Sequence, residues 1–132
     1  MKIQYLPLFN HSVAAGFPSP ADDYLDRSLD LHSYLIKHPA ATYFARAKGE
    51  SMQGRGIFSG DLLIVDRSRN AQHGDIIIAV LDGQLCCKIL DKNKQCLLSA
   101  HKNYQPITIN EFSELIIEGV VIHSVRHHVL PG

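Results

Sequence analysis

Residues 75–90 have the sequence DIIIAVLDGQLCCKIL, in which two apolar runs flank Asp82 and Gly83. This pattern predicts a β-hairpin with a two-residue type I′ turn, because both turn positions need positive φ, which Asp and Gly tolerate. The turn sets the register of the two strands. The expected pairs are Leu81 with Gln84, Val80 with Leu85, Ala79 with Cys86, Ile78 with Cys87, and Ile77 with Lys88. The hairpin therefore determines which side chains share a face of the sheet.

Side chains alternate between the two faces of a strand, so this register divides the hairpin into two sets. One set is expected to form the core face: Ile76, Ile78, Val80, Leu85, Cys87 and Ile89. The opposite face contains Ile77, Ala79, Cys86 and Lys88. Lys88 is thus expected in the middle of a strand among apolar neighbours, away from the tip of the hairpin.

Two interpretations of Lys88 are open. The side chain could lay its stem along the apolar surface and keep its ammonium group in water. Alternatively, the amine is desolvated. Burial disfavours the charged form of an amine and lowers the pKa of a lysine from its usual value of about 10.4. A lysine lowered to about 7–8 can act as a general base and accept the proton of a serine hydroxyl.

A candidate serine lies in residues 47–68, AKGESMQGRGIFSGDLLIVDRS. Ser51 stands in a glycine-rich turn just before the apolar strand pattern of residues 62–65. Most serines in such turns only hydrogen-bond to the backbone of the turn or face solvent. Three glycines permit tight backbone turns here: Gly49, Gly54 and Gly56. The backbone N–H groups of Ser51 and Met52 could then form an oxyanion hole, with Ser51 as candidate nucleophile and Lys88 as candidate base.

The remaining strand patterns all lie beyond residue 40 and predict a mainly β fold, a small, curled, antiparallel sheet. They are TYFARAK from Thr42, DLLIVD from Asp61, the hairpin, and LIIEGVVIHSV from Leu115. We therefore expect residues 41–132 to form one β-domain.

Residues 1–40 are expected to form an extended, mobile N-terminal arm with one short helix. Gly16, Pro18 and Pro20 favour an extended or turning chain. The helix is predicted in DLHSYLIKHP, from Asp30 as N-cap to Pro39 as its stop. Its apolar face would consist of Leu31, Tyr34 and Leu35.

Composition excludes several classes of function. The 132 residues suffice for one domain, and 13 basic residues cancel 13 acidic ones. This balance argues against direct binding to nucleic acid or to a membrane surface. No apolar run approaches the roughly 18 residues of a membrane span, and the N-terminus lacks the apolar core of a signal peptide. We therefore expect a cytoplasmic protein.

Neither disulfide, metal nor cofactor chemistry is predicted. Cys86, Cys87 and Cys96 are odd in number and form no C-x-x-C pattern, so they are expected to be buried thiols. The eight histidines are expected to be scattered on the surface: His11, His32, His38, His73, His101, His123, His127 and His128. The last two are expected in a frayed tail. A Ser-His-Asp triad with His101 or His123 is conceivable, but no G-x-S-x-G motif is present.

Several motifs together resemble the self-cleaving serine peptidase family of LexA and UmuD. They are GESM (49–52), GDLLIVD (60–66), HGDIIIAVLDG (73–83) and the lysine of CCKIL (86–90). The similarity is closer to UmuD than to LexA. Four further stretches of this sequence resemble UmuD in the same order: GFPSPADDY (16–24), HPAATYF (38–44), PITI (106–109) and GVVIH (119–123). The resemblance extends from about Ala15 to Val125. LexA-type repressors fit less well, because only about 40 residues precede the expected sheet, too few for their helix-turn-helix domain.

The resemblance implies a LexA/UmuD/signal-peptidase-like fold with Ser51 as nucleophile and Lys88 as base. It implies self-cleavage between Ala15 and Gly16. It also implies a homodimer of the SOS response, stimulated by RecA filaments on single-stranded DNA, whose trimmed form joins a UmuC-like error-prone translesion polymerase. The alternative is a dimeric binding module that is never cut and serves only as an accessory to the polymerase or the RecA filament.

Overall fold

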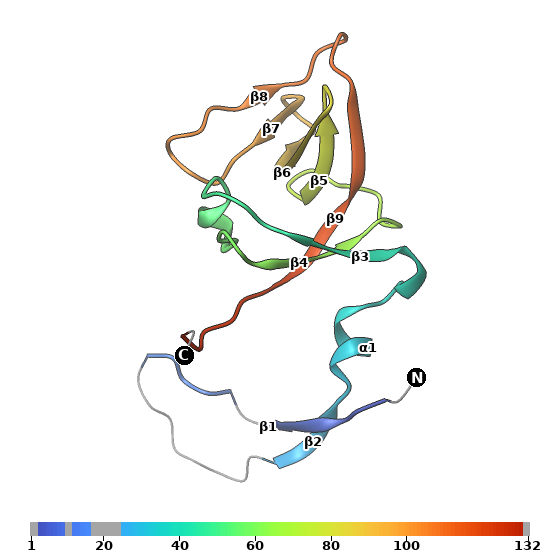
Figure 1. Ribbon diagram of the computed structural model, residues 1–132, viewed down its shortest axis with the longest axis vertical. Coiled ribbons are helices and arrows are strands. Elements are labelled where there is room, and N and C mark those ends of the chain that lie inside the picture. Colours follow the sequence, from blue (N-terminus) through green and yellow to red (C-terminus); the bar gives the residue numbers. More distant parts are fainter. Residues whose placement is uncertain (1–2, 10–11, 17–24, 131–132) are drawn as a thin grey trace. The chain divides into compact units, whose positions relative to one another are not determined.

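In the part of the chain that the structure describes, the fold is mainly β with one short α-helix, as predicted (Figure 1). The computed structural model describes residues 3–9, 12–16 and 25–130. The chain divides into two compact units, Met1–Lys37 and His38–Gly132, which are described separately below.

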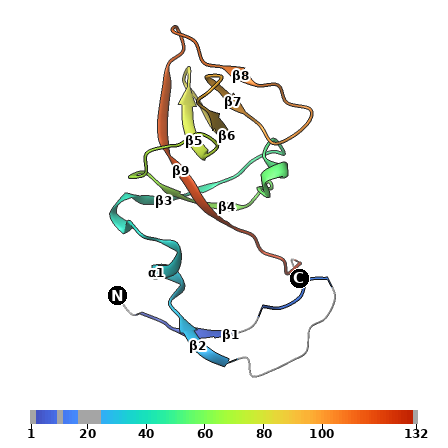
Figure 2. The ribbon, with the colours of Figure 1, turned by 180° about the vertical axis from the view of Figure 1, so that it is seen from behind.

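The unit His38–Gly132 contains one antiparallel sheet in the order β3-β4-β9-β5-β6-β7-β8. Its strands are β3 (Thr42–Arg46), β4 (Leu62–Asp66), β5 (Ile76–Leu81), β6 (Gln84–Asp91), β7 (Cys96–Leu98), β8 (Ile107–Thr108) and β9 (Leu115–Val125). β9 pairs with β4 over one half of its length and with β5 over the other (Figures 1 and 2). It therefore connects the ribbon of β3 and β4 to the hairpin of β5 and β6.

β9 is irregular where it changes partner. Its register shifts opposite Ile64 and Val65, and again opposite Ile78 and Ala79. Gly119 lies between these positions with φ of 156°, and a Cβ atom there would lie 2.6 Å from Cγ1 of Val65. Because bulges bend and twist a strand, these two positions curl the sheet.

The hairpin of β5 and β6 has the predicted register in all five expected pairs. Asp82 and Gly83 have φ of 50° and 82°, as a type I′ turn requires. The prediction of a single core face was wrong at Leu85, which is 72% exposed beside the hairpin tip, while Ile77 on the opposite face is completely buried.

The curled sheet explains this difference, because it buries parts of both hairpin faces. Ile78 belongs to a core cluster with Leu63 and Val65 of β4. Ile77 belongs to a second cluster with Leu97 of β7. A prediction from alternation alone assumes one buried face, and a sheet that folds over itself does not meet that assumption.

The described residues of the unit Met1–Lys37 include two strands, so the expectation that all strands lie beyond residue 40 was wrong. β1 (Leu6–Phe9) and β2 (Leu25–Leu29) form an antiparallel pair with an irregular register near Phe9. Pro7 weakens the strand signal of β1, yet a two-stranded sheet has only edge strands, where proline is tolerated. Residues 17–24, on which part of the extended-arm prediction rests, lie outside the described residues.

The predicted helix is present as α1 (Leu31–Leu35), with Asp30 as its N-cap residue. The Ser33 hydroxyl donates to the Asp30 carboxylate at 2.6 Å. The helix ends before Pro39, because Ile36 is already extended, and Pro39 instead begins a 3₁₀ turn, Pro39–Ala41.

The predicted apolar face of α1 is only partly buried. Leu31 and Tyr34 are 55% and 58% exposed, respectively. Leu35 is half-buried. A five-residue helix offers little area for burial, so its sequence pattern predicts its existence better than its packing.

All three cysteines are free thiols. Cys96 is buried, whereas Cys86 and Cys87 are half-buried, so the expectation of buried thiols holds fully only for Cys96. No helix in the described part of the chain has the length and apolar character needed to cross a membrane.

Candidate functional site

Ser51 lies in the turn that follows β3, next to a side chain that anchors the turn in the core. The turn continues into a short 3₁₀ helix, Gln53–Arg55, which ends at Gly56 in the left-handed conformation. Met52 is only 4% exposed and packs in the core cluster of β4 and β5. Because Met52 is fixed, the neighbouring half-buried Ser51 has a defined place at the surface of the core.

The Lys88 amine reaches this turn from the middle of β6. Its Nζ donates to Oγ of Ser51 at 3.0 Å, across a sequence separation of 37 residues. It also donates to Oγ of Ser99 at 2.8 Å, and it lies 5.3 Å from the centre of the Tyr104 ring. Within the described residues no carboxylate forms an ion pair with Lys88. The structure thus brings the two predicted dyad residues together.

The segment after β7 is bonded to the backbone of the serine turn. The N–H of Ala100 donates to the Ser51 carbonyl at 2.7 Å, and the N–H of Gly54 donates to the Ala100 carbonyl at 2.7 Å. A Cβ atom on Gly54 would lie 2.6 Å from that carbonyl oxygen, so only glycine permits this approach. These contacts hold the turn in register with β6 and β7.

The candidate oxyanion donors lie beside the serine hydroxyl. Neither the Ser51 nor the Met52 backbone N–H donates a hydrogen bond to another residue that the structure describes. Two adjacent amides without such an acceptor suit a developing oxyanion. Their role remains a prediction.

A cleft of about 380 Å³ opens beside Ser51 and Lys88. One wall consists of residues 45–49 at the end of β3, and another consists of residues 85–88 of β6. β3 is an edge strand of the sheet, so a further extended segment can pair with its free side. One wall of the cleft therefore offers a backbone edge with which an extended peptide can pair.

Two thiols line the same cleft, but neither suits a nucleophile. Burial raises the pKa of Cys86, and it raises the pKa of Cys87 to about 11. The thiolate is the reactive form of cysteine, and both thiols keep their protons at neutral pH. Ser51 is therefore the better candidate.

The residues of the expected cut belong to the other unit. Ala15 and Gly16 lie in a bend and are exposed. No heavy atom lies within 4 Å of the position that a Cβ atom on Gly16 would take. Cleavage at this bond remains a prediction.

His101 lies close to the serine turn, with its Nε2 3.9 Å from the Glu50 carboxylate. Among the described residues, the Ser51 hydroxyl is hydrogen-bonded by Lys88 and not by His101 or His123. His101 lies edge-on to the Tyr104 ring, with ring centres 5.3 Å apart, and its Nδ1 accepts from the N–H of Asn103. This arrangement offers no support for a Ser-His-Asp triad.

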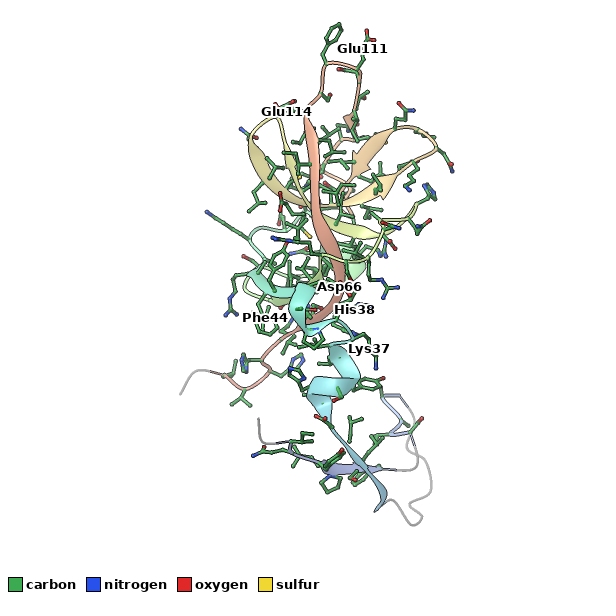
Figure 3. All side chains as sticks on the ribbon, turned by 90° about the vertical axis from the view of Figure 1, so that its right-hand side faces the viewer. Lys37, His38, Phe44, Asp66, Glu111 and Glu114 are labelled. Atoms are coloured by element: carbon green, nitrogen blue, oxygen red, sulfur yellow. The ribbon has the colours of Figure 1, made fainter. Side chains whose placement is uncertain are left out.

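The expectation of scattered surface histidines was incomplete. Nδ1 of His38 lies 2.6 Å from the buried carboxylate of Asp66, the last residue of β4 (Figure 3). His123 belongs to β9, and His127 follows that strand. No group of three metal-binding side chains occurs within the described residues.

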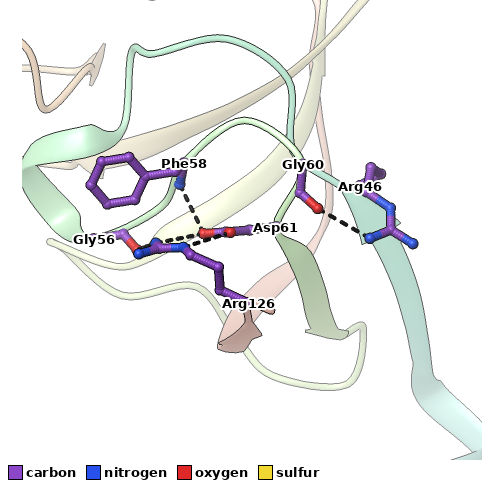
Figure 4. Close-up of polar contacts among 6 residues, drawn as sticks. All are labelled: Arg46, Gly56, Phe58, Gly60, Asp61 and Arg126. Atoms are coloured by element: carbon purple, nitrogen blue, oxygen red, sulfur yellow. Dashed lines mark hydrogen bonds and ion pairs between the residues drawn. The ribbon is translucent and has the colours of Figure 1, made fainter. Parts of the chain in front are cut away.

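The sequence analysis did not single out Arg126, and it expected a frayed tail at the next two residues, His127 and His128. Its guanidinium donates to both carboxylate oxygens of Asp61, at 2.8 Å each, and to the Gly56 carbonyl at 2.7 Å (Figure 4). It also lies 4.1 Å from the centre of the Phe58 ring. Asp61 is only 1% exposed. The Arg126 side chain therefore fixes the loop that follows the serine turn.

We expect the Arg126→Ala chain to unfold at a lower urea concentration than the wild-type chain at pH 7. The hydrogen bonds from Arg126 hold the pKa of Asp61 below its usual value, although burial opposes this. A lowered folded-state pKa stabilises the protein above the unfolded-state pKa of about 3.9. That stabilisation is lost as the pH falls through the folded-state pKa.

The difference between the two chains should therefore shrink as the pH falls from the unfolded-state pKa of about 3.9 toward the lower folded-state pKa of Asp61. Urea titrations at neutral and acidic pH measure it. Arg69→Ala removes an exposed arginine and is the matched control. Equal urea midpoints for wild type and Arg126→Ala at pH 7 would contradict this prediction.

Comparison with known proteins relates this chain to a family of peptidases. Residues 7–122 match the Peptidase S24-like family. Protein ImpA of Salmonella typhimurium is 47% identical over 125 residues, which cover 94% of this chain and 82% of ImpA. Protein MucA of Escherichia coli is 39% identical over 129 residues, or 96% of this chain and 88% of MucA. The LexA repressor of Ectopseudomonas mendocina is 36% identical over 117 residues, or 86% of this chain and 57% of the repressor.

Proposed function

Because the chain belongs to the Peptidase S24-like family, as the resemblance to LexA and UmuD led us to expect, we propose that it is a UmuD-like, self-cleaving serine peptidase. Ser51 is the nucleophile, Lys88 is the general base, and the bond between Ala15 and Gly16 is the one that is cut. One observation supports this assignment most strongly: the Lys88 amine lies 3.0 Å from the Ser51 hydroxyl.

The reaction begins when the neutral Lys88 amine accepts the proton of the Ser51 hydroxyl. The Ser51 oxygen attacks the carbonyl carbon of Ala15, and the N–H groups of Ser51 and Met52 stabilise the oxyanion. The Lys88 ammonium then gives its proton to the Gly16 nitrogen as the peptide bond breaks. A water molecule, deprotonated by Lys88, hydrolyses the ester on Ser51 and restores the hydroxyl.

The sequence around the expected cut suits the cleft. The methyl side chain of Ala15 needs little space, and Gly16 lets the backbone approach the nucleophile closely. An extended segment can pair with the free edge of β3, which forms one wall of the cleft. No cofactor is needed for these steps.

We expect the larger product of self-cleavage to begin at Gly16 and to comprise residues 16–132. Ala15→Trp should block the cut, because the indole is too large for a pocket that accepts a methyl group. Gly16→Pro should also block it, since proline fixes φ and removes the amide hydrogen. Sequencing of the product's N-terminus and its intact mass locate the cut.

Ala14→Trp is the matched control, because neighbouring side chains of an extended peptide point in opposite directions. It should be cut at the wild-type position. A product that begins at any residue other than Gly16 would refute this site while leaving the dyad in place.

The similarity to ImpA and MucA supports a place in the UmuD-like branch. We infer that the protein is a cytoplasmic homodimer that acts in SOS mutagenesis. RecA filaments on single-stranded DNA stimulate its cleavage, and the trimmed dimer serves a UmuC-like translesion polymerase. The protein itself contacts neither DNA nor membrane, in keeping with its balanced charge.

A further inference from the structure

The Lys88 amine has a second hydroxyl partner that the dyad does not include. Oγ of Ser99 lies 2.8 Å from Nζ of Lys88, slightly closer than Oγ of Ser51 at 3.0 Å. Ser99 is half-buried and directly follows β7. The hydroxyls of Ser99 and Ser51 are therefore hydrogen-bonded to the same amine.

Strand pairing fixes the place of Ser99. β6 and β7 pair Ile89 with Leu98, so the next position of this antiparallel register sets Ser99 opposite Lys88. The following residue, Ala100, donates its N–H to the carbonyl of Ser51 at 2.7 Å. One short segment thus contacts both members of the dyad.

The hydrogen bond between Lys88 and Ser99 affects how the neutral amine is oriented. A neutral amine has two N–H bonds and one lone pair, and only the lone pair can accept the Ser51 proton. An N–H bond directed at Ser99 limits rotation about the last carbon–nitrogen bond of Lys88, and it leaves the lone pair free to face Ser51. Without Ser99, the amine can adopt any of its staggered orientations.

We propose that Ser99 is a positioning residue for self-cleavage, whose hydroxyl accepts a hydrogen bond from the Lys88 amine and thereby directs its lone pair at the Ser51 hydroxyl. This inference rests on the proposed function, in which Lys88 is the base. Ser99 takes no part in bond making or breaking.

Few other titratable groups face the amine. Within the described residues these are Tyr104 from the loop after β7, and Cys86 and Cys87 of β6. The nearby Glu50 carboxylate lies 3.9 Å from His101 and forms no ion pair with Lys88. Within the described residues, the hydrogen-bond partners of the amine are therefore the hydroxyls of Ser51 and Ser99.

We expect the full-length Ser99→Ala chain to cut itself at least about tenfold more slowly at its pH plateau, because a misdirected base loses alignment with its target. Ser99→Thr keeps the hydroxyl and should restore a rate close to that of the wild type.

The rates are measured by intact mass spectrometry over a range of pH, with urea midpoints to verify folding. Ser124→Ala removes an exposed serine of β9 and should keep the wild-type rate and pH profile. If the wild-type chain is never cut, the proposed function fails, whatever Ser99 does. If the wild type is cut and Ser99→Ala matches it, or if Ser99→Thr is as slow as Ser99→Ala, the role of Ser99 is overturned.

Discussion

The Ser51→Ala chain is expected to remain at full length under conditions in which the wild-type chain is cut. Removal of a catalytic nucleophile costs a rate factor on the order of 10⁶ in serine peptidases, so no product should form within the time of the assay. The fold should persist, because Lys88 retains its hydrogen bond to Ser99 and loss of one half-buried hydroxyl changes the unfolding free energy by about 1 kcal/mol or less. Gel electrophoresis and urea titration measure the two effects.

Ser51→Cys provides a sharper comparison, since a thiol can replace the hydroxyl as nucleophile and should keep some activity. Ser124→Ala controls for the loss of a serine elsewhere. If Ser51→Ala still releases the shorter fragment, the nucleophile is another residue.

Self-cleavage should be lost equally in Lys88→Ala and in Lys88→Arg. Alanine removes the base, and a guanidinium group keeps the charge but does not lose its proton in proteins. In the wild type the rate should rise with pH, because only the neutral amine can accept the Ser51 proton. Time courses at several pH values measure the rate.

Lys94→Ala removes an exposed lysine of the turn after β6 and is the matched control. It should be cut like the wild type. A cleavage rate that is constant between about pH 6 and pH 10 would contradict the assignment of Lys88, because only the neutral amine can act as the base. So would cleavage of Lys88→Ala.

The hairpin of β5 and β6 shows what a sequence alone can predict. Its register follows from two turn residues, Asp82 and Gly83, whose conformational preferences are local. The burial of its faces was predicted less well, because Ile77 and Leu85 owe their environments to the curl of the whole sheet. The alternation of side chains between the two faces of a strand contains no information about that curl.

The features of the site that the sequence alone did not predict depend on contacts between residues far apart in the chain. The meeting of Ser51 and Lys88 was expected only through the resemblance to a known family, because their separation of 37 residues carries no geometric information by itself. Ser99 depends on the pairing of β6 with β7, for which the sequence has no distinctive turn signal. Arg126 meets Asp61 across 65 residues, and although Asp61 lies in the GDLLIVD motif, Arg126 belongs to no motif identified in the sequence.

Intact mass spectrometry of the purified wild-type chain tests the central claim most directly. The chain is incubated at alkaline pH, and in parallel at neutral pH with RecA filaments on single-stranded DNA. The account predicts that under both conditions the mass of residues 1–132 is replaced by the masses of residues 1–15 and 16–132. A chain that keeps its full-length mass under both conditions would contradict self-cleavage and would indicate a binding module that is never cut.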